Sequence, residues 1–289
     1  DLFGLGLRGT VDPGAHQALA ERILAARRLL RERLKDPRCR GLVEVFDRDL
    51  YNKNMSVAEN LLFGLPIDNT FDIERLSDHP YVQEVLEKVG LRGELVAVGL
   101  RMAKIMLDLL GDLAPGHEFF ERFSFIAAED LPEYRAIIRR VEDAGLAGAA
   151  PADRNALSSL PFRAIPARHR LGLFDDVTER RLLQARRLFA QDLPPDLEGS
   201  VAFFDAEAYN PAASVQDNIL FGKLVYGRQQ AQRQVGAIIA EVIDELGLRA
   251  DVVDLGLDFG VGIGGSRLST AQRQKLAIAR ALLKRPDIL

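Results

Sequence analysis

Apolar residues recur at helical spacing in several stretches of the chain, with charged residues between them. Residues 20–34, 82–89 and 235–246 show this spacing, which predicts three amphipathic helices. Residues 41–46 form a short apolar run that predicts a strand. Because helical spacing dominates, the pattern predicts a helix-rich protein with few, short strands.

An internal repeat organises this pattern. Residues 46–64 (FDRDLYNKNMSVAENLLFG) and residues 204–222 (FDAEAYNPAASVQDNILFG) are identical at 10 of 19 positions. Shorter matches flank them in the same order: LAARRL at 24–29 with LQARRL at 183–188, and EVLEKVGLR at 84–92 with EVIDELGLR at 241–249. The chain therefore contains a duplicated unit.

Local signals predict where helices start and where the two units divide. Ser56 and Ser214 are good helix N-caps, because each is followed three positions later by an acidic residue. Residues 144–152 are rich in Ala, Gly and Pro, which is typical of a boundary. We therefore expect one unit with a divergent helical tail over residues 1–145 and a second over residues 146–289.

An apolar-Gly-Leu turn is predicted to close each unit. It occurs at residues 98–100 and again at residues 255–257. Residues 5–7 repeat it, as the tail of an earlier unit would. Together with the incipient strand at the C-terminal residues, this leads us to expect a piece of a longer polypeptide.

Composition excludes several classes of protein. The 38 basic and 42 acidic residues give a net charge of -4, which argues against a nucleic-acid binder acting through overall charge. The apolar runs fall short of the roughly 18 to 20 residues that a membrane span needs. A single cysteine, Cys39, excludes an intrachain disulfide, and the four histidines lack metal-binding spacing.

Three further clusters are interpreted as structural. The arginines within residues 27–33 are expected on a solvated helix face, with a phosphate or partner contact as the alternative. The phenylalanines within residues 119–125 are expected in the core, with a docking surface as the alternative. An acid-tyrosine pair recurs in both units and is expected to serve folding rather than ligand binding: Asp47 with Tyr51, and Asp205 with Tyr209.

The last thirty residues carry the candidate chemistry. A glycine-rich turn at residues 262–267 leads into LSTAQRQKLAIARALLKRPDIL. Ser269 at the N-cap and Gln272 three positions later form a capping box, which leaves other backbone N–H groups free to bind an anion such as phosphate. The helix is expected to bury one face through Leu276, Ala279 and Leu283 and to stop at Pro286.

Residues 268–289 resemble the signature segment of an ATP-binding cassette (ABC) ATPase, LSGGQ followed by a helix of the RQRxAIARALL type and an apolar strand. SVAENLLFG and SVQDNILFG resemble the stretch that follows the Q-loop in exporter-type members. The resemblance implies that Leu268 is a buried anchor. It also implies the residues that hold the γ-phosphate of ATP bound to an opposing ATPase domain: Ser269, Thr270, Ala271 and Gln272.

The resemblance further implies the cofactors, partners and location of the protein. These are ATP and Mg²⁺, a second ATPase domain in a homo- or heterodimer, and the transmembrane domain of a transporter, with no nucleic acid. The implied place is the cytoplasmic side of a membrane, the inner membrane in a bacterium. The implied fold class is α/β and helix-rich, a partial ABC ATPase domain with duplicated, mostly helical units.

Departures from the family pattern limit this expectation. Thr270 and Ala271 replace the two signature glycines, and no G-x-x-x-x-G-K-[ST] phosphate loop occurs. The Q-loop glutamine is absent at residues 46–48 and 204–206. The acidic residues that ligate magnesium in the family would follow Leu289, outside this chain.

Three functional hypotheses follow. In the first, the chain supplies the signature motif of a transporter ATPase, hydrolyses ATP only as part of the full-length protein and is inactive alone. In the second, it is a degenerate, non-hydrolysing regulatory or scaffold module. In the third, it belongs to an ABC ATPase that acts on DNA or ribosomes.

Overall fold

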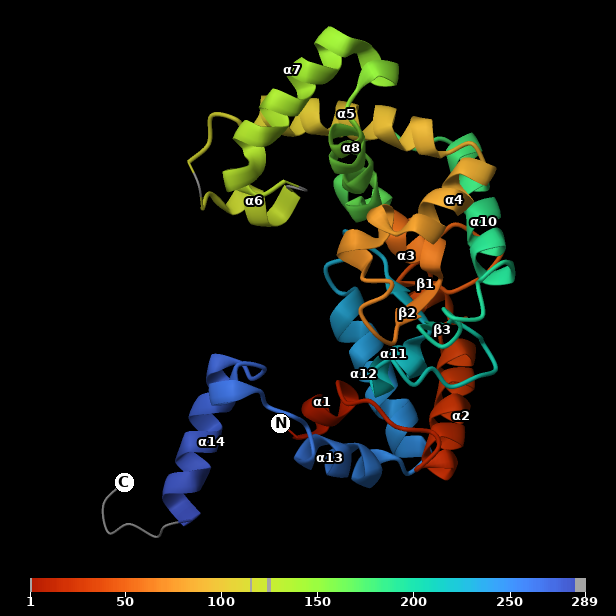
Figure 1. Cartoon of the computed structure of the whole chain (residues 1–289). Coiled ribbons are helices and arrows are strands. Elements are labelled where there is room, and N and C mark those ends of the chain that lie inside the picture. The colour runs from red at the N-terminus through yellow and green to blue at the C-terminus, as the bar shows by residue number, and fades with distance from the viewer. Residues whose placement is uncertain (1, 115, 124–125, 284–289) are drawn as a thin grey trace.

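The computed structural model describes residues 2–114, 116–123 and 126–283, and helices dominate this part of the chain (Figure 1). The helices are α1 (Leu2–Leu7), α2 (Gln17–Arg33), α3 (Val57–Leu62), α4 (Pro80–Lys88), α5 (Arg92–Leu110), α6 (Glu118–Phe123), α7 (Leu131–Gly148), α8 (Pro151–Arg163), α9 (Pro166–His169), α10 (Asp176–Gln191), α11 (Val215–Leu220), α12 (Ala231–Glu245), α13 (Arg249–Leu257) and α14 (Thr270–Leu283). The strands are β1 (Val43–Val45), β2 (Gly64–Pro66), β3 (Val201–Phe203) and β4 (Gly222–Leu224). The helix-rich composition and the helices and strand expected from apolar spacing are confirmed.

Local sequence sets the starts of α3 and α11. Ser56 Oγ accepts a hydrogen bond from the Glu59 N–H at 3.1 Å, and Glu59 Oε2 accepts one from the Ser56 N–H at 2.7 Å. In the second repeat, Ser214 Oγ accepts from the Asp217 N–H at 3.0 Å. Both predicted N-caps are therefore confirmed.

The strands pair between the repeats. β1 pairs antiparallel with β4, with Val45 opposite Gly222, and β2 pairs antiparallel with β3, with Gly64 opposite Phe203. Because β1 and β3 are equivalent by sequence, as are β2 and β4, each ladder takes one strand from each repeat. The repeats are therefore interlocked.

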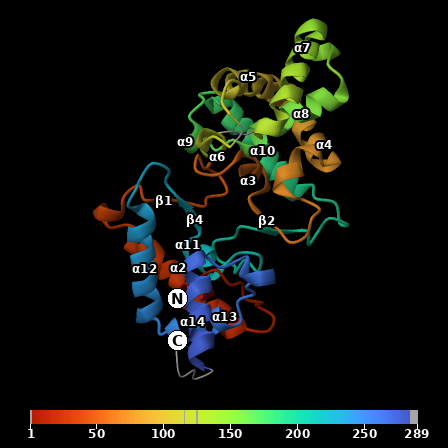
Figure 2. The same ribbon diagram turned by 90° about the vertical axis from the view of Figure 1, so that its left-hand side faces the viewer.

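The helices also pack between the repeats, and they form two lobes, each with helices from both repeats. In the first lobe, α1 and α2 of the first repeat pack on α11, α12 and α13 of the second. In the second lobe, α8 and α10 pack on α3, α4 and α5 of the first repeat, and α7 also covers this lobe. Figures 1 and 2 show the lobes one above the other, with the strands between them.

Close helix crossings join the repeats within each lobe. A Cβ atom added to Gly99 in α5 would lie 1.9 Å from the Leu157 carbonyl oxygen of α8. One added to Gly256 in α13 would lie 2.0 Å from the Leu2 carbonyl oxygen of α1. The glycines at residues 98–100 and 255–257 thus serve helix crossings, so the prediction of closing turns there is wrong. The packing of α1 on α13 matches the packing of α8 on α5. Residues 5–7 lie in α1, so they belong to the helix of the first repeat that corresponds to α8.

The expected boundary between the units falls inside α7. Gly145 there has a φ of 72°, which interrupts the helix. Val141 before it and Ala149 after it belong to the same hydrophobic cluster. The division into residues 1–145 and 146–289 stays a prediction.

Two structural expectations hold only in part: Arg28, Arg31 and Arg33 are exposed as expected, and Phe120 packs against the core, but one residue of each cluster differs. Arg27 is buried at 3% exposure rather than on a solvated face, because its guanidinium bonds to the other repeat, as described below. Phe119 is exposed, so it is not a core residue. The side chains of Phe123 and Phe125 lie outside the described residues. None of the described helices combines the length and apolarity that a membrane span needs.

Candidate functional site

The glycine-rich turn before α14 depends on glycine conformations. Gly262, Gly264 and Gly265 all have positive φ angles, which side chains other than hydrogen disfavour. The Leu268 N–H donates to the Gly265 carbonyl at 2.9 Å, and the Leu268 side chain is buried. Leu268 is therefore the buried anchor that the resemblance implied.

The predicted capping box at the start of α14 is confirmed. The Ser269 N–H donates to Gln272 Oε1 at 2.9 Å, and the Gln272 N–H donates to Ser269 Oγ at 3.2 Å. Ser269, Thr270 and Ala271 are exposed, and Gln272 is half-buried. Within the described residues, the backbone N–H groups of Thr270 and Ala271 have no hydrogen-bond partner. They are exposed donors at the positive end of a helix.

Arginines add positive charge near this helix start. Arg273 Nη2 donates to Thr270 Oγ1 at 3.4 Å, and Arg273 Nη1 donates to the Gly265 carbonyl at 3.5 Å. Arg8 Nη1 donates to the Arg267 carbonyl at 3.5 Å, which brings a residue from the start of the chain to the turn. Two free amides beside guanidinium groups are suited to a phosphate oxygen.

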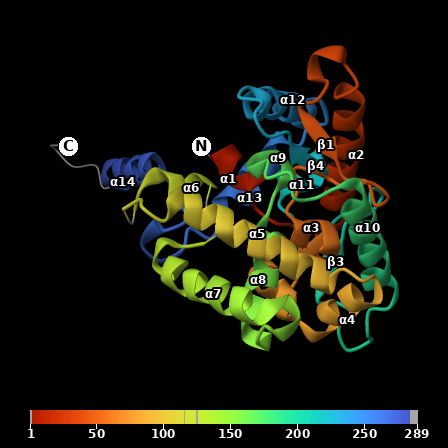
Figure 3. The same ribbon diagram turned by 90° about the horizontal axis from the view of Figure 1, so that it is seen from above.

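The face of α14 differs from expectation. No residue of this helix is buried, and Leu276 and Leu283 are exposed, so the prediction that the helix buries one face is wrong for this structure. Figure 1 shows α14 standing apart from both lobes, and in Figure 3 it lies at the left-hand edge of the view. Lys284, Arg285 and Pro286, which were expected to end the helix, lie outside the described residues.

Sequence reasoning missed a pair of buried arginines that lock the repeats together. Arg186 Nε donates to the Asn60 carbonyl at 2.6 Å, and Arg186 Nη2 donates to Asn60 Oδ1 at 2.8 Å. Arg186 Nη1 donates to three carbonyls of the turn after β1, those of Asp47, Arg48 and Leu50.

Arg27 makes the equivalent contacts in the other direction. Its guanidinium bonds to the Asn218 carbonyl and side chain and to three carbonyls of the turn after β3, those of Asp205, Ala206 and Ala208. Burial lowers the pKa of Arg27 and Arg186 to about 10, which leaves both protonated at neutral pH. The duplicated ARRL was the available signal, since each copy keeps this arginine.

In the part of the chain that the structure describes, the carboxylates of the recurring acid-tyrosine pairs bond to the backbone of their own turns. Asp47 Oδ1 accepts from the Asp49 N–H, and Asp205 Oδ1 accepts from the Glu207 N–H, both at 2.8 Å. Burial raises the pKa of Tyr51 above its usual value and that of Tyr209 to about 12. Neither group is therefore prepared to act as an acid or a base at neutral pH.

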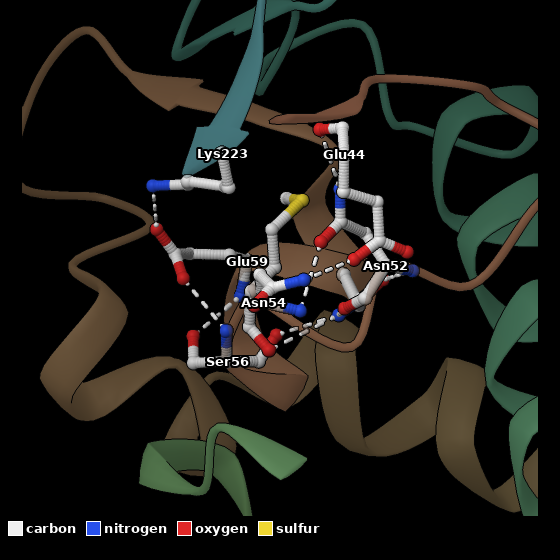
Figure 4. Close-up of polar contacts among 8 residues, drawn as sticks. Glu44, Asn52, Asn54, Ser56, Glu59 and Lys223 are labelled. Atoms are coloured by element: carbon white, nitrogen blue, oxygen red, sulfur yellow. Dashed lines mark hydrogen bonds and ion pairs between the residues drawn. The ribbon is translucent and has the colours of Figure 1, made fainter. Parts of the chain in front are cut away.

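A network that contains charged residues lies beside the β1–β4 ladder (Figure 4). Lys223 Nζ of β4 pairs with Glu59 Oε1 at 2.8 Å, and Asn54 Nδ2 donates to a carboxylate oxygen of Glu44 in β1. The positions equivalent to Lys223, Glu44 and Asn54 hold apolar residues: Leu65, Ala202 and Ala212. Since Lys223 pairs with Glu59 and the Glu44 carboxylate accepts hydrogen bonds from Asn54 and the Lys53 N–H, the network stabilises the ladder and the start of α3.

Comparison with known proteins adds the family context. No protein-family profile and no solved structure matches the chain. The chain is 37% identical over 100 residues to an ATP-dependent lipid A-core flippase of Xylella fastidiosa, covering 32% of this chain and 15% of that protein. It is 27% identical over 180 residues to a probable multidrug resistance ABC transporter ATP-binding/permease protein of Bacillus subtilis, covering 61% of this chain and 28% of that protein.

A third relative is a putative export ATP-binding/permease protein of Rickettsia bellii, 31% identical over 98 residues, which are 33% of this chain and 16% of that protein. The curated relatives are ABC transporter proteins. The chain spans less than a third of the length of each of these three relatives. They support a general role in ABC transport.

Proposed function

We propose that this chain is the signature-bearing part of an ABC ATPase domain and contacts ATP held by an opposing domain. The observation that carries the proposal is the exposed capping box at the start of α14, with free N–H groups on Thr270 and Ala271. These donors lie at the positive end of a helix of 14 residues, beside Arg273. They fit a terminal phosphate that approaches from another subunit.

The start of α14 fits a phosphate group of ATP, but the part of the chain that the structure describes supplies no magnesium site. The described residues contain no group of three or more His, Cys, Asp or Glu side chains arranged for a metal ion. Mg²⁺, when bound with ATP, would neutralise phosphate charge and would be held by residues outside this chain. Ser269 and Gln272 would hold the helix start rigid, and the amides of Thr270 and Ala271 would bind phosphate oxygens. Alone, the chain would not hydrolyse ATP.

The proposal includes the partners and location of the complete protein. A second ATPase domain would hold the nucleotide, in a homo- or heterodimer. A transmembrane domain would use closure of the two domains to drive transport, with this chain on the cytoplasmic side of the membrane. The relatives combine ATP-binding and permease parts by name, which supports this arrangement.

ATP turnover by the longer protein that contains this chain tests the proposal. Ser269→Arg places a bulky group where the phosphate would approach, and we expect turnover to fall about tenfold or more. Ser266→Arg is the matched control, because Ser266 is also exposed in the preceding turn but lies outside the helix start. The isolated chain should show no turnover. Strong turnover by the isolated chain would contradict the proposed division of parts.

A non-hydrolysing scaffold is the second candidate. It is favoured by Thr270 and Ala271, whose side chains stand where the family pattern has glycines and crowd a close phosphate approach. If Ser269→Arg leaves the turnover of the longer protein unchanged, the helix start does not contact nucleotide and the scaffold role is supported. Equal loss in Ser269→Arg and Ser266→Arg would indicate a folding defect of the turn, which contradicts a specific phosphate contact.

A further inference from the structure

A cavity of about 580 Å³ lies where the two repeats meet, between α2, α10 and the turns after β1 and β3. Phenylalanines from both repeats line it. Phe46 stacks on Phe204 with ring centroids 4.2 Å apart and planes inclined by 20°. Phe63 meets Phe204 edge-on at 5.6 Å, and Phe221 meets Phe46 edge-on at 5.4 Å. We call this space the phenylalanine cavity; its volume and aromatic walls suit a flat ring system.

Arginine and alanine change places between the two ends of this cavity. At one end, Arg31 lines the cavity from α2 and Ala206 lines it from the turn after β3. At the other end, the equivalent positions are reversed: Ala190 of α10 faces the turn that carries Arg48. We call the buried guanidiniums of Arg27 and Arg186, with the carbonyls that they bond, the arginine clamps. A clamp places position 31 opposite position 206, because Arg27, one turn before Arg31, bonds to the Ala206 carbonyl at 2.9 Å.

Arg186, one turn before Ala190, bonds to the Arg48 carbonyl at 3.0 Å in the same way. At these paired positions each end of the cavity therefore has one arginine, Arg31 or Arg48, although the repeats supply it from different elements. A purely structural contact between helix and turn needs no guanidinium, since the clamps already hold the two together. One guanidinium at each end points instead to recognition of negative charge.

The other charged groups that line the cavity already have partners. The Arg186 guanidinium donates its hydrogen bonds to the carbonyls of the clamp, and Arg187 pairs with Asp49 at 3.0 Å. The carboxylates of Asp47 and Asp205 accept backbone N–H groups of their own turns. Arg31 and Arg48 are exposed, and neither guanidinium has an ion-pair partner among the described residues. They are the free charges of the site.

We propose that the phenylalanine cavity binds an aromatic acid, that is, a flat ring system that carries an acidic group. The rings of Phe46, Phe63, Phe204 and Phe221 would pack against the ligand ring, and Arg31 or Arg48 would bind its anionic group. This site is separate from the start of α14 and does not depend on nucleotide contact there. Its occupant is a small molecule, because a volume of about 580 Å³ is of the size that holds one.

A pair of fluorescent probes that differ in charge tests the proposal on the whole chain. 1-Anilinonaphthalene-8-sulfonate carries an anionic sulfonate on a flat naphthalene ring, and N-phenyl-1-naphthylamine is its uncharged counterpart. We expect one saturable site for the sulfonate. We expect Arg31→Ala/Arg48→Ala to weaken sulfonate binding about tenfold or more while the uncharged probe binds as before.

Matched variants separate this site from general hydrophobic binding. Arg101→Ala/Arg139→Ala removes the same charge from exposed arginines outside the cavity and should leave both affinities unchanged. Ala190→Trp fills the cavity from α10 without removing an arginine, and it should weaken both probes. Arg31→Ala/Arg48→Ala/Ala206→Arg returns one guanidinium to the end that held Arg31 and should restore part of the sulfonate affinity lost in Arg31→Ala/Arg48→Ala.

Several results would overturn the proposal. Unchanged sulfonate affinity in Arg31→Ala/Arg48→Ala would show that the guanidiniums do not bind the anion. Equal losses in that variant and in the Arg101→Ala/Arg139→Ala control would show a general charge effect. If Ala190→Trp keeps the circular dichroism spectrum of the parent chain and binds both probes unchanged, the probes bind elsewhere.

Discussion

Phe46 and Phe204 occupy equivalent positions in the two repeats and stack directly on each other, with ring centroids 4.2 Å apart. Equivalent residues make contact in this way where two copies of a unit meet about a two-fold axis. The paired ladders, the arginine clamps and the glycine crossings are related by the same approximate symmetry. The two repeats thus form an intertwined pair within one chain.

Removing one arginine clamp should destabilise the protein strongly. Arg186→Ala removes the side-chain donor to the carbonyls of Asn60, Arg48 and Leu50 and leaves the Asp47 carbonyl with only the Leu50 N–H. We expect the free energy of unfolding, measured by urea denaturation, to fall by about 3 to 5 kcal/mol. Arg187→Ala is the neighbouring control and should cost less than about 0.5 kcal/mol, because its ion pair with Asp49 is exposed. Similar losses in both variants would contradict the clamp.

The close helix crossings at Gly99 and Gly256 should not tolerate a methyl group on either glycine. In Gly99→Ala the new Cβ would meet the Leu157 carbonyl, so α5 and α8 would have to move apart. We expect the free energy of unfolding to fall by about 1 to 3 kcal/mol, and likewise for Gly256→Ala. Gly93→Ala, in the same helix but with no atom within 4 Å of the added Cβ, should be neutral or stabilising by up to about 1 kcal/mol. Thermal unfolding of all three variants measures these changes, and a loss in Gly93→Ala as large as in Gly99→Ala would contradict the role of the crossing.

His169 should make stability depend on pH below neutrality. Burial lowers its pKa to about 4, and its Nδ1 accepts a hydrogen bond from the Ile165 N–H at 2.9 Å, which only the neutral ring can do. Since the unfolded pKa is about 6.5, the unfolded state binds the proton first as the pH falls. The stability contribution is complete above pH about 6.5 and is lost progressively down to pH about 4.

A histidine replacement isolates this effect from the carboxylates. His169→Asn keeps an acceptor near Nδ1 but cannot titrate, so its free energy of unfolding should fall less steeply between pH about 6.5 and pH about 4.5 than that of the parent chain. His16→Asn changes an exposed histidine and should reproduce the slope of the parent chain. Equal slopes for the parent chain and His169→Asn would rule out His169 as the source. Urea denaturation at several pH values provides the comparison.

The two capping boxes should differ in their contribution to stability. Ser56→Ala breaks a buried box at the start of α3, and we expect a loss of about 1 to 2 kcal/mol in the free energy of unfolding. Ser269→Ala breaks an exposed box on a helix without buried residues. It should leave global unfolding unchanged and speed amide hydrogen exchange in the first turn of α14. A global loss in Ser269→Ala as large as in Ser56→Ala would contradict the separation of α14 from the lobes.

Local elements could be predicted well because their causes lie within a few residues. Apolar spacing gave α2, α4 and α12, and the serine-acid pairs gave the starts of α3 and α11. The Ser269–Gln272 box and the buried Leu268 also follow from neighbouring residues. Capping and helical amphipathicity depend on residues within one or two helical turns, so they can be found from the sequence alone.

Long-range partners could not be predicted in this way. Arg27 has the polarity and spacing of a surface residue, and only the approach of Asn218 from the other repeat turns it into a buried clamp. Gly99 looks like a turn residue until Leu157 packs against it. The exposed face of α14 likewise has the apolar pattern of a buried helix.

The sequence by itself determined that the unit is duplicated, where α3, α11 and α14 begin, and that the start of α14 presents free amides. The tertiary structure decided that the copies exchange strands, arginine contacts and helix crossings, and that the phenylalanine cavity lies at their junction, with Arg31 at one end and Arg48 at the other. The physical reason is that a duplicated sequence is equally compatible with two side-by-side units or two interlocked ones. Only the packing of residues far apart in the chain selects between them.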